Sequence, residues 1–300
     1  MTTLVVSPSV TVADGARFCA AAAAAIAAGA DLQAVLVANS TGTQALAREW
    51  PDLVVAGSNE GFAASINQGA AGRHFDWLAI ANDDMDFRPE AFLELAAHLA
   101  GEPADDARLI RLTDEPWRHL PGVMGVFTGL SLLEKVAYGL GRSLSSEPTP
   151  LASDVYPSFG MVAVSDRLWQ DTKGLEEALP FCYEDAWFVR KARAMAPGLR
   201  LTTHDLGLHH IRSATTGANI HVVLPVIAWS AVVYLQLMGV RAGPARAVCV
   251  AALVIRAPLS LAGQADRRKH LRGIGRSLRA ILTDRRPFLP TPSEFPTARG

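Results

Sequence analysis

The stretch Trp77-Leu78-Ala79-Ile80-Ala81-Asn82-Asp83-Asp84 joins a run of apolar residues to three polar ones. A continuous apolar run of this length is typical of a β-strand that is covered on both faces, as in parallel sheets. The polar residues after such a strand lie at its carboxyl end, where open α/β sheets bind their ligands. The stretch therefore predicts a buried parallel strand that carries carboxylates to the edge of a crevice.

Other apolar runs place this strand in a larger sheet. Strands are expected at 4–6, 34–37, 53–55 and 155–164, and helices at 16–28, 44–49, 63–71 and after Pro89. Strands and helices that alternate in this way predict an open, mostly parallel α/β sheet flanked by helices. Asn39 and Asn59 then follow two of the strands and lie at the same sheet edge as Asp83 and Asp84. Residues 124–138 are expected to form a helix or a mobile lid.

The acidic strand end is a candidate metal site. Hard divalent cations such as Mg²⁺ or Mn²⁺ take oxygen ligands, and one or two carboxylates suffice when a diphosphate supplies the rest. The structural alternative is a solvated acidic turn in which an Asp caps the helix after Pro89.

The segment Asn59-Glu60-Gly61-Phe62 opens the next helix, which carries Asn67-Gln68-Gly69. Gly61 allows a tight backbone turn, and the start of a helix favours a bound anion such as a diphosphate. The alternative is an ordinary turn from a strand into a helix.

Taken together, these segments resemble the family-2 glycosyltransferases, which have the GT-A fold. Three further stretches are similar to motifs of that family and follow in the same order: Lys173-Gly174-Leu175-Glu176-Glu177, Phe181-Cys182-Tyr183-Glu184-Asp185 and Gly207-Leu208-His209-His210. The resemblance covers about residues 30–216.

The resemblance implies a role for each matching residue. The donor, a nucleoside-diphosphate sugar, would be bound by Asn39, Asn59, Gly61, Phe62, Asn67 and Asp83. Asp84 would bind the divalent cation, with His209 as a further metal ligand. Asp185 would be the general base that takes the proton of the acceptor hydroxyl, giving inversion at the sugar carbon, and Glu184 would orient Asp185 or the acceptor. Arg212 is a further candidate for contact with phosphate.

Each of these roles has a structural alternative. Glu184 and Asp185 also suit the negatively charged first turn of a helix. His209 and His210 also suit a pair of surface histidines.

Two departures from the family's pattern affect the nucleotide half of the donor site. Ser7-Pro8-Ser9-Val10 stands where the family has Thr-Tyr-Asn, and Ala38 stands where it has an Asp that contacts the base. A degenerate, non-catalytic protein that binds a nucleotide sugar or assembles partners at a membrane is therefore the alternative function. A nucleotidyltransferase would need a glycine-rich, basic loop after the first strand, and residues 7–14 contain none.

Composition favours the cytoplasm as the location. The net charge of −1 gives no general attraction to nucleic acid. Three separated cysteines (Cys19, Cys182 and Cys249) fit a reducing compartment better than a disulfide framework or a zinc site. The N-terminus lacks the basic region of a secretory signal.

The last part of the chain has a different character. Residues 222–238 and 245–262 are apolar, and 241–286 hold 11 Arg and Lys against two Asp. We expect a GT-A-like domain at 1–216, with a nucleotide-sugar part at about 1–100 and an acceptor part at about 101–216. We expect residues 217–300 to form a helical segment.

Broken apolar helices with interspersed arginines suit attachment to an anionic membrane surface. Helices packed on the catalytic domain, or on a second copy in a homodimer, are the alternative. Within the family, the strand that ends in Asn82-Asp83-Asp84 and this C-terminal segment together look most like rhamnosyltransferases of cell-wall or O-antigen assembly. This similarity implies a glycan or lipid-linked acceptor at the inner face of the plasma membrane.

Overall fold

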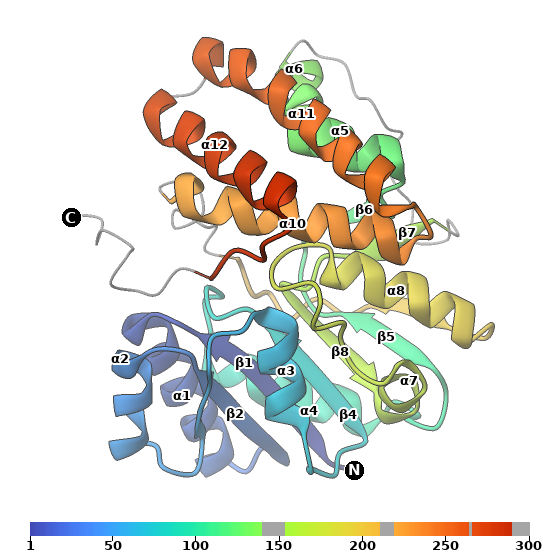
Figure 1. The fold of residues 1–300 in the computed structure, drawn as a ribbon. Helices are drawn as coiled ribbons and strands as arrows, with labels where there is room; N and C mark the ends of the chain where they lie inside the picture. The colour runs from blue at the N-terminus through green and yellow to red at the C-terminus, as the bar shows by residue number, and fades with distance from the viewer. Residues whose placement is uncertain (140–153, 211–218, 264–265, 290–300) are drawn as a thin grey trace.

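A computed structural model describes residues 1–139, 154–210, 219–263 and 266–289 of the chain. These residues form a seven-stranded sheet in the order β3-β2-β1-β4-β8-β5-β9 (Figure 1). The strands are β1 Thr3–Ser9, β2 Leu32–Ala38, β3 Val54–Ala56, β4 Trp77–Ala81, β5 Arg108–Arg111, β8 Met161–Ser165 and β9 Arg200–Thr203. The first four are parallel to one another, and β8 runs antiparallel between β4 and β5.

Helices cover both faces of the sheet. Helices α1 (Val12–Ala27) and α4 (Pro89–Ala100) pack on one face, where Val5 of β1 points. Helices α3 (Phe62–Ala70), α7 (Asp166–Thr172) and α8 (Glu184–Met195) pack on the other face, together with Leu4 and Val6 of the same strand. The short helix α2 (Thr41–Gln44) and the 3₁₀ helix η1 (Ala45–Arg48) follow β2. Burial on both faces explains why β4 and the middle parts of β1 and β2 have continuous apolar sequences.

A layer of helices lies at one end of the molecule. It contains α5 (Val123–Ser131), α6 (Leu133–Gly139), α11 (Ala242–Gly263) and α12 (Arg267–Thr283). Helix α10 (Ile220–Leu237) lies between this layer and the α/β part, on the side toward which β1 runs from the N-terminus (Figure 1). A two-stranded antiparallel sheet, β6 (Trp117–His119) with β7 (Val155–Pro157), also lies on this side. The helical layer therefore faces the carboxyl ends of the parallel strands.

The predicted fold class is confirmed: the sheet is mostly parallel, helices flank it, and the C-terminal segment is helical. This is the architecture that the GT-A resemblance implied. The single strand expected at 155–164 was wrong, because β7 and β8 are separate and pair in different sheets. Residues 124–138 are helical, and the break between α5 and α6 comes at Leu132, whose φ of 69° is left-handed.

Two C-terminal helices are long and apolar enough to cross a membrane by length and composition. The core helix of a soluble protein passes the same test, so burial has to be considered. In α10, 61% of the apolar window is buried inside the protein, against 33% in α11. Helix α10 is therefore a core helix, and α11 has the more exposed surface. Helices α5 and α6, from the first 216 residues, belong to the same layer.

Candidate active site

Asp84, in the turn after β4, forms one end of a chain of polar contacts. Its Oδ1 lies 2.6 Å from Nε2 of His210, and Nδ1 of the same imidazole lies 2.8 Å from Oε1 of Glu115. His210 is held in place by the backbone, since it pairs with Met85 in an antiparallel β-bridge. A segment about 125 positions further along the chain thus places an imidazole between two carboxylates.

This arrangement favours the charged form of His210. Each ring nitrogen faces a carboxylate oxygen, and only the doubly protonated imidazole donates from both nitrogens. Hydrogen bonds to Asp84 and Glu115 raise the pKa of His210 to about 9, against the opposing effect of partial burial. The hydrogen bond from His210 also lowers the pKa of Glu115.

His209, the residue selected from the sequence as a metal ligand, lies differently. Its side chain is 70% exposed, and its Nδ1 lies 3.7 Å from Oδ2 of Asp114. The structure therefore brings His210, and not His209, into contact with Asp84. Arg212 lies outside the described residues.

The residues around Asp84 fit a divalent cation that is completed by its substrate. Within the described ranges, no group of three His, Cys, Asp or Glu side chains is arranged to hold a metal ion by itself. One carboxylate and one imidazole are nevertheless in contact at the end of β4. Mg²⁺ is commonly held by one or two carboxylates and the phosphates of a substrate. Asp84 would supply one ligand, and His210 a second one after it loses the proton on Nε2. A diphosphate of the substrate would supply the rest.

Asp83, predicted to bind the donor, is bonded within the protein. Its Oδ2 accepts a hydrogen bond of 2.7 Å from Oγ of Ser9, at the end of β1. Burial raises the pKa of Asp83 to about 7, and the bond from Ser9 opposes that shift. Ser9 belongs to the segment that departs from the family's opening motif. In this protein, a residue of that segment therefore holds the Asp83 side chain.

Glu184 and Asp185 form the first turn of α8. Burial raises the pKa of both carboxyls, and the negative charge of Asp185 raises the pKa of Glu184 further. The positive charge of Arg118, from β6, opposes the rise at Asp185. Oε2 of Glu184 is buried without a hydrogen-bond partner among the described residues. Asp185 is therefore the carboxylate of this pair that has a nearby cation to hold it ionised.

Arg118 connects the two halves of the site. It is close enough to lower the pKa of Glu115, after the larger effect of His210, and it also acts on Asp185. Asp84, His210 and Glu115 are thus in contact with one another, and the charge of Arg118 acts on both Glu115 and Asp185. Sequence reasoning missed Glu115 and Arg118, because both lie in the part of the chain between 101 and 150 that has no readable periodicity.

The asparagines predicted to bind the donor are engaged within the protein. Asn39 is buried; its amide donates to Oγ of Ser65 at 3.0 Å, and its Oδ1 accepts from the backbone of Asn59 at 3.1 Å. Asn67 donates to the carbonyl of Leu175 at 2.9 Å and accepts from the Leu175 backbone N–H at 2.9 Å. Both side chains therefore join segments that surround the site.

Gly61 and Phe62 bring the start of α3 against the loop before Asp185. Gly61 has a φ of +132°, and a Cβ there would lie 2.5 Å from the carbonyl oxygen of Pro180. The backbone N–H of Phe62 donates to the same carbonyl at 3.1 Å. At the far end of the motif, a Cβ on Gly69 would lie 2.4 Å from Val6 of β1. The motif therefore sets how closely α3 approaches the sheet and the Asp185 loop.

A groove of about 430 Å³ runs along the exposed side of α3. It is lined by Ser58, Glu60, Ala64, Ser65, Asn67, Gln68, Ala71 and Glu177. Neither Asp84 nor Asp185 lines it. Because the charged groups lie elsewhere, the candidate site is placed at Asp84 and Asp185 and not in this groove.

Glu184→Gln is expected to stabilise the protein at alkaline pH. The folded state keeps the Glu184 carboxyl protonated above the ordinary pKa of about 4.3, at which the unfolded chain loses that proton. The folded state then binds more protons than the unfolded state, so wild-type stability falls as pH rises above that value. The glutamine amide carries no proton to lose, so the variant does not share this loss of stability at high pH. The melting temperature of the variant should exceed that of the wild type at about pH 9, with a smaller difference at about pH 4. An equal difference at both pH values would contradict a buried, protonated Glu184.

No protein-family model matches the chain, and no curated protein matches it either. Among solved structures, TarS from S. aureus aligns with 13% identity and a TM-score of 0.40, covering 94% of this chain and 81% of that one. A mannosyltransferase from Pyrobaculum calidifontis in complex with GDP-Man and Mn²⁺ aligns with 13% identity and a TM-score of 0.49, covering 94% and 87%.

Glucosyl-3-phosphoglycerate synthase from Mycobacterium tuberculosis, with Mn²⁺, UDP and its product, aligns with 14% identity and a TM-score of 0.47, covering 80% and 81%. Because all three TM-scores lie below 0.5, these likenesses say nothing about the chemistry of this chain, which has to come from its own residues.

Proposed function

We propose that this protein is a metal-dependent, inverting glycosyltransferase that uses a nucleoside-diphosphate sugar. One observation carries the proposal: Arg118 lies close enough to act on the pKa of both Glu115, in the Asp84–His210–Glu115 cluster, and Asp185, at the carboxyl edge of the sheet. A phosphate-binding half and a base-bearing half then belong to one site, as sugar transfer requires.

Asp185 serves as the general base in this reaction. The acceptor hydroxyl oxygen forms a bond to the anomeric carbon of the donor, and its proton passes to Asp185. The bond from that carbon to the diphosphate oxygen breaks, and the nucleoside diphosphate leaves with the electron pair. Attack opposite the leaving group inverts the configuration at the carbon. Asp84 and His210 would hold the divalent cation, which would supply positive charge to offset the charge on the leaving diphosphate.

The protein's own residues orient this chemistry. Arg118 favours the ionised form of Asp185, which has to be free of its proton before it can accept another. Asn67 bonds α3 to the Leu175 backbone, and Gly61 lets the start of α3 approach Pro180, in the loop before Asp185. For the acceptor we propose a hydroxyl of a glycan or lipid-linked saccharide in cell-envelope synthesis, and for the sugar a hexose or rhamnose.

Donor binding that depends on Mn²⁺ tests the proposal. Because the described residues offer too few ligands to hold the ion alone, Mn²⁺ and a nucleotide sugar should bind weakly by themselves and more tightly together. Isothermal titration with a panel of UDP-, GDP- and dTDP-sugars, with Mn²⁺ and with EDTA, measures this coupling. Absence of metal-dependent binding across the panel would reject the proposed activity. Binding without transfer to any acceptor would favour the non-catalytic alternative.

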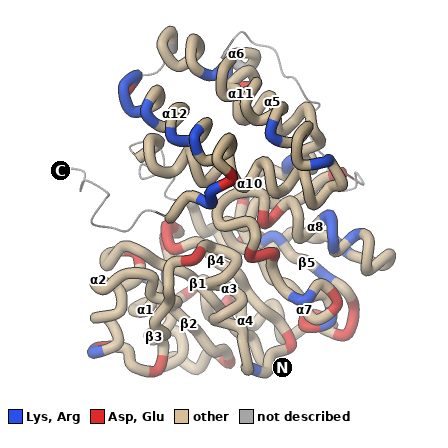
Figure 2. Tube along the Cα trace, viewed as in Figure 1, with Lys and Arg blue, Asp and Glu red and all other residues tan. Residues whose placement is uncertain are grey.

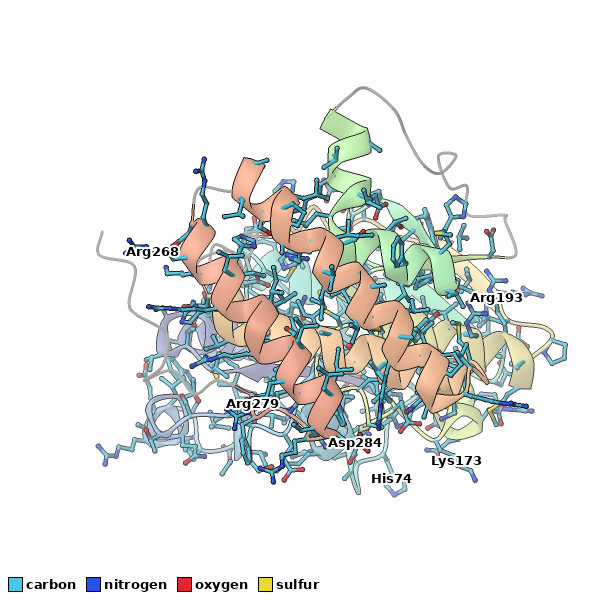
Figure 3. The ribbon with its side chains drawn as sticks, turned by 45° about the horizontal axis from the view of Figure 1, so that its top comes forward. His74, Lys173, Arg193, Arg268, Arg279 and Asp284 are labelled. Atoms are coloured by element: carbon cyan, nitrogen blue, oxygen red, sulfur yellow. The ribbon has the colours of Figure 1, made fainter. Side chains whose placement is uncertain are left out.

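We also propose that the protein attaches to the cytoplasmic face of a membrane through its helical layer. Helix α12 buries one side against the protein and exposes arginines on the other, and Figure 2 shows these cations along its length. Arg268 and Arg279 lie near its two ends (Figure 3). Leu271 and Leu282 are exposed on the same helix, and Val254 is 57% exposed on α11. Cations mixed with apolar side chains suit an anionic lipid surface.

Charge reversal on α12 should weaken this attachment. Each cation near an anionic membrane contributes about 1 kcal/mol, so Arg272→Glu with Arg276→Glu should reduce vesicle affinity by about 30-fold or more. Sedimentation with vesicles containing phosphatidylglycerol measures the effect, and salt should weaken wild-type binding. Arg73→Glu with Arg200→Glu, two exposed positions on the α/β part, is the matched control. Equal losses in the two double variants would mean that net charge matters and α12 does not.

A further inference from the structure

The loop before Asp185 has an unusual backbone. Cys182 and Tyr183, the two residues that precede Glu184, have left-handed φ values of 66° and 70°. Side chains other than glycine disfavour this region, and such conformations persist only where surrounding contacts impose them. Tyr183 is also the N-cap of α8, so its conformation sets the direction in which Glu184 and Asp185 leave the loop.

Helix α10 supplies those contacts, chiefly through Tyr234. This side chain is fully buried. Its ring stacks on Tyr183, with centroids 5.1 Å apart and planes 27° apart, and meets the edge of Trp187 at 6.3 Å. One turn earlier on α10, Oγ of Ser230 accepts a hydrogen bond of 3.5 Å from the backbone of Phe181. The left-handed loop is therefore packed against α10 along its length.

The hydroxyl of Tyr234 makes a second set of contacts, with Pro121 and Arg190. It donates to the carbonyl of Pro121 at 3.0 Å and accepts from Nε of Arg190, on α8, at 3.3 Å. Nη2 of Arg190 donates to the same carbonyl at 3.3 Å. Pro121 follows β6, the strand that carries Arg118. One side chain thus connects the segment that bears Arg118 with the helix that bears Asp185.

We infer that Tyr234 is a positioning residue, which fixes Asp185 relative to Arg118 through its ring and its hydroxyl. This inference rests on the proposed transferase function. It gives α10 a part in the active site, although the helix is apolar enough to be mistaken for a membrane span. Tyr234 does not touch the reacting atoms, so its removal acts on the rate of transfer and not on the binding of the donor.

Tyr234→Leu tests the inference. A displacement of the catalytic carboxylate by about 1 Å can slow a reaction about 100-fold, so the kcat of sugar transfer should fall by about that factor. The affinity for a UDP- or GDP-sugar with Mn²⁺ should stay within about threefold. Tyr234→Phe keeps the stacked ring, so its kcat should be at least about tenfold higher than that of Tyr234→Leu. Leu235→Ala, also fully buried on α10, is the matched control for lost packing.

Hydrogen exchange gives a readout that does not need turnover. The Trp187 amide donates to the carbonyl of Tyr183 at 2.8 Å, so loosening the loop should speed its exchange in Tyr234→Leu more than in Leu235→Ala. Equal exchange and equal kcat in these two variants would overturn the inference, and so would a parallel loss of donor affinity. If the wild type transfers no sugar, the proposed function fails, while the exchange rates still show whether Tyr234 holds the loop.

Discussion

Asp185→Asn is expected to reduce sugar transfer by about 10²–10⁴-fold, the usual contribution of a general base. In the wild type, the backbone N–H of Ala186 donates to Oδ1 of Asp185 at 2.7 Å. The amide of the variant has the same size and can still accept this hydrogen bond. It cannot take a proton from the acceptor hydroxyl. Donor affinity should change little, because Asp84 and His210, and not Asp185, are the proposed ligands of the cation that binds the donor diphosphate. Single-turnover assays and titration with the donor separate the two quantities.

The control for this experiment is a carboxylate in a similar place on another helix. Asp166 lies in the first turn of α7, as Asp185 does in α8, and is remote from the charged cluster. Asp166→Asn should therefore keep both rate and donor affinity near wild-type values. A fall in donor affinity that matches the fall in rate for Asp185→Asn would mean that the base is misassigned.

The sheet could be predicted because burial on both faces leaves a clear pattern. The apolar runs at 4–6, 34–37 and 77–81 were predicted as strands, and they lie within β1, β2 and β4. Strand direction leaves no such trace. The apolar run of β8 is as buried as that of β4, yet β8 is antiparallel. Residues 158–160 separate β7 from β8. Their composition does not mark a turn, so the sequence predicted one long strand across them.

The charged residues of the site were only partly predictable. Successive residues of an extended segment point in opposite directions, so a histidine pair presents one ring to the site and the other to solvent. Pairing with Met85 selects His210, and no feature of the sequence alone fixes that register. Asn39 and Asn67 could not be assigned either. An amide that binds a ligand and an amide that binds the backbone have the same sequence signature.

Asp84→Ala is expected to abolish the effect of Mn²⁺ on donor binding. Removing a residue that merely supports a ligand costs about 10–100-fold in metal affinity, so removal of the carboxylate itself should cost at least that much. The variant also leaves His210 with Glu115 as its only carboxylate partner among the described contacts. Titration of the donor at fixed Mn²⁺ measures the loss, with Asp114→Asn, an exposed carboxylate nearby, as the control.

Substitution of each histidine in turn decides which one belongs to the metal site. His210→Gln should weaken Mn²⁺-dependent binding to an extent comparable with Asp84→Ala, because His210 is the ring in contact with that carboxylate. His209→Gln should have a small effect, since its ring is exposed and faces Asp114. The opposite result would mean that the segment shifts by one residue when the donor binds, and that the exposed ring turns inward. If neither histidine variant changes Mn²⁺-dependent donor binding, Asp84 is the protein's sole ligand among the residues tested, and the diphosphate supplies most of the coordination.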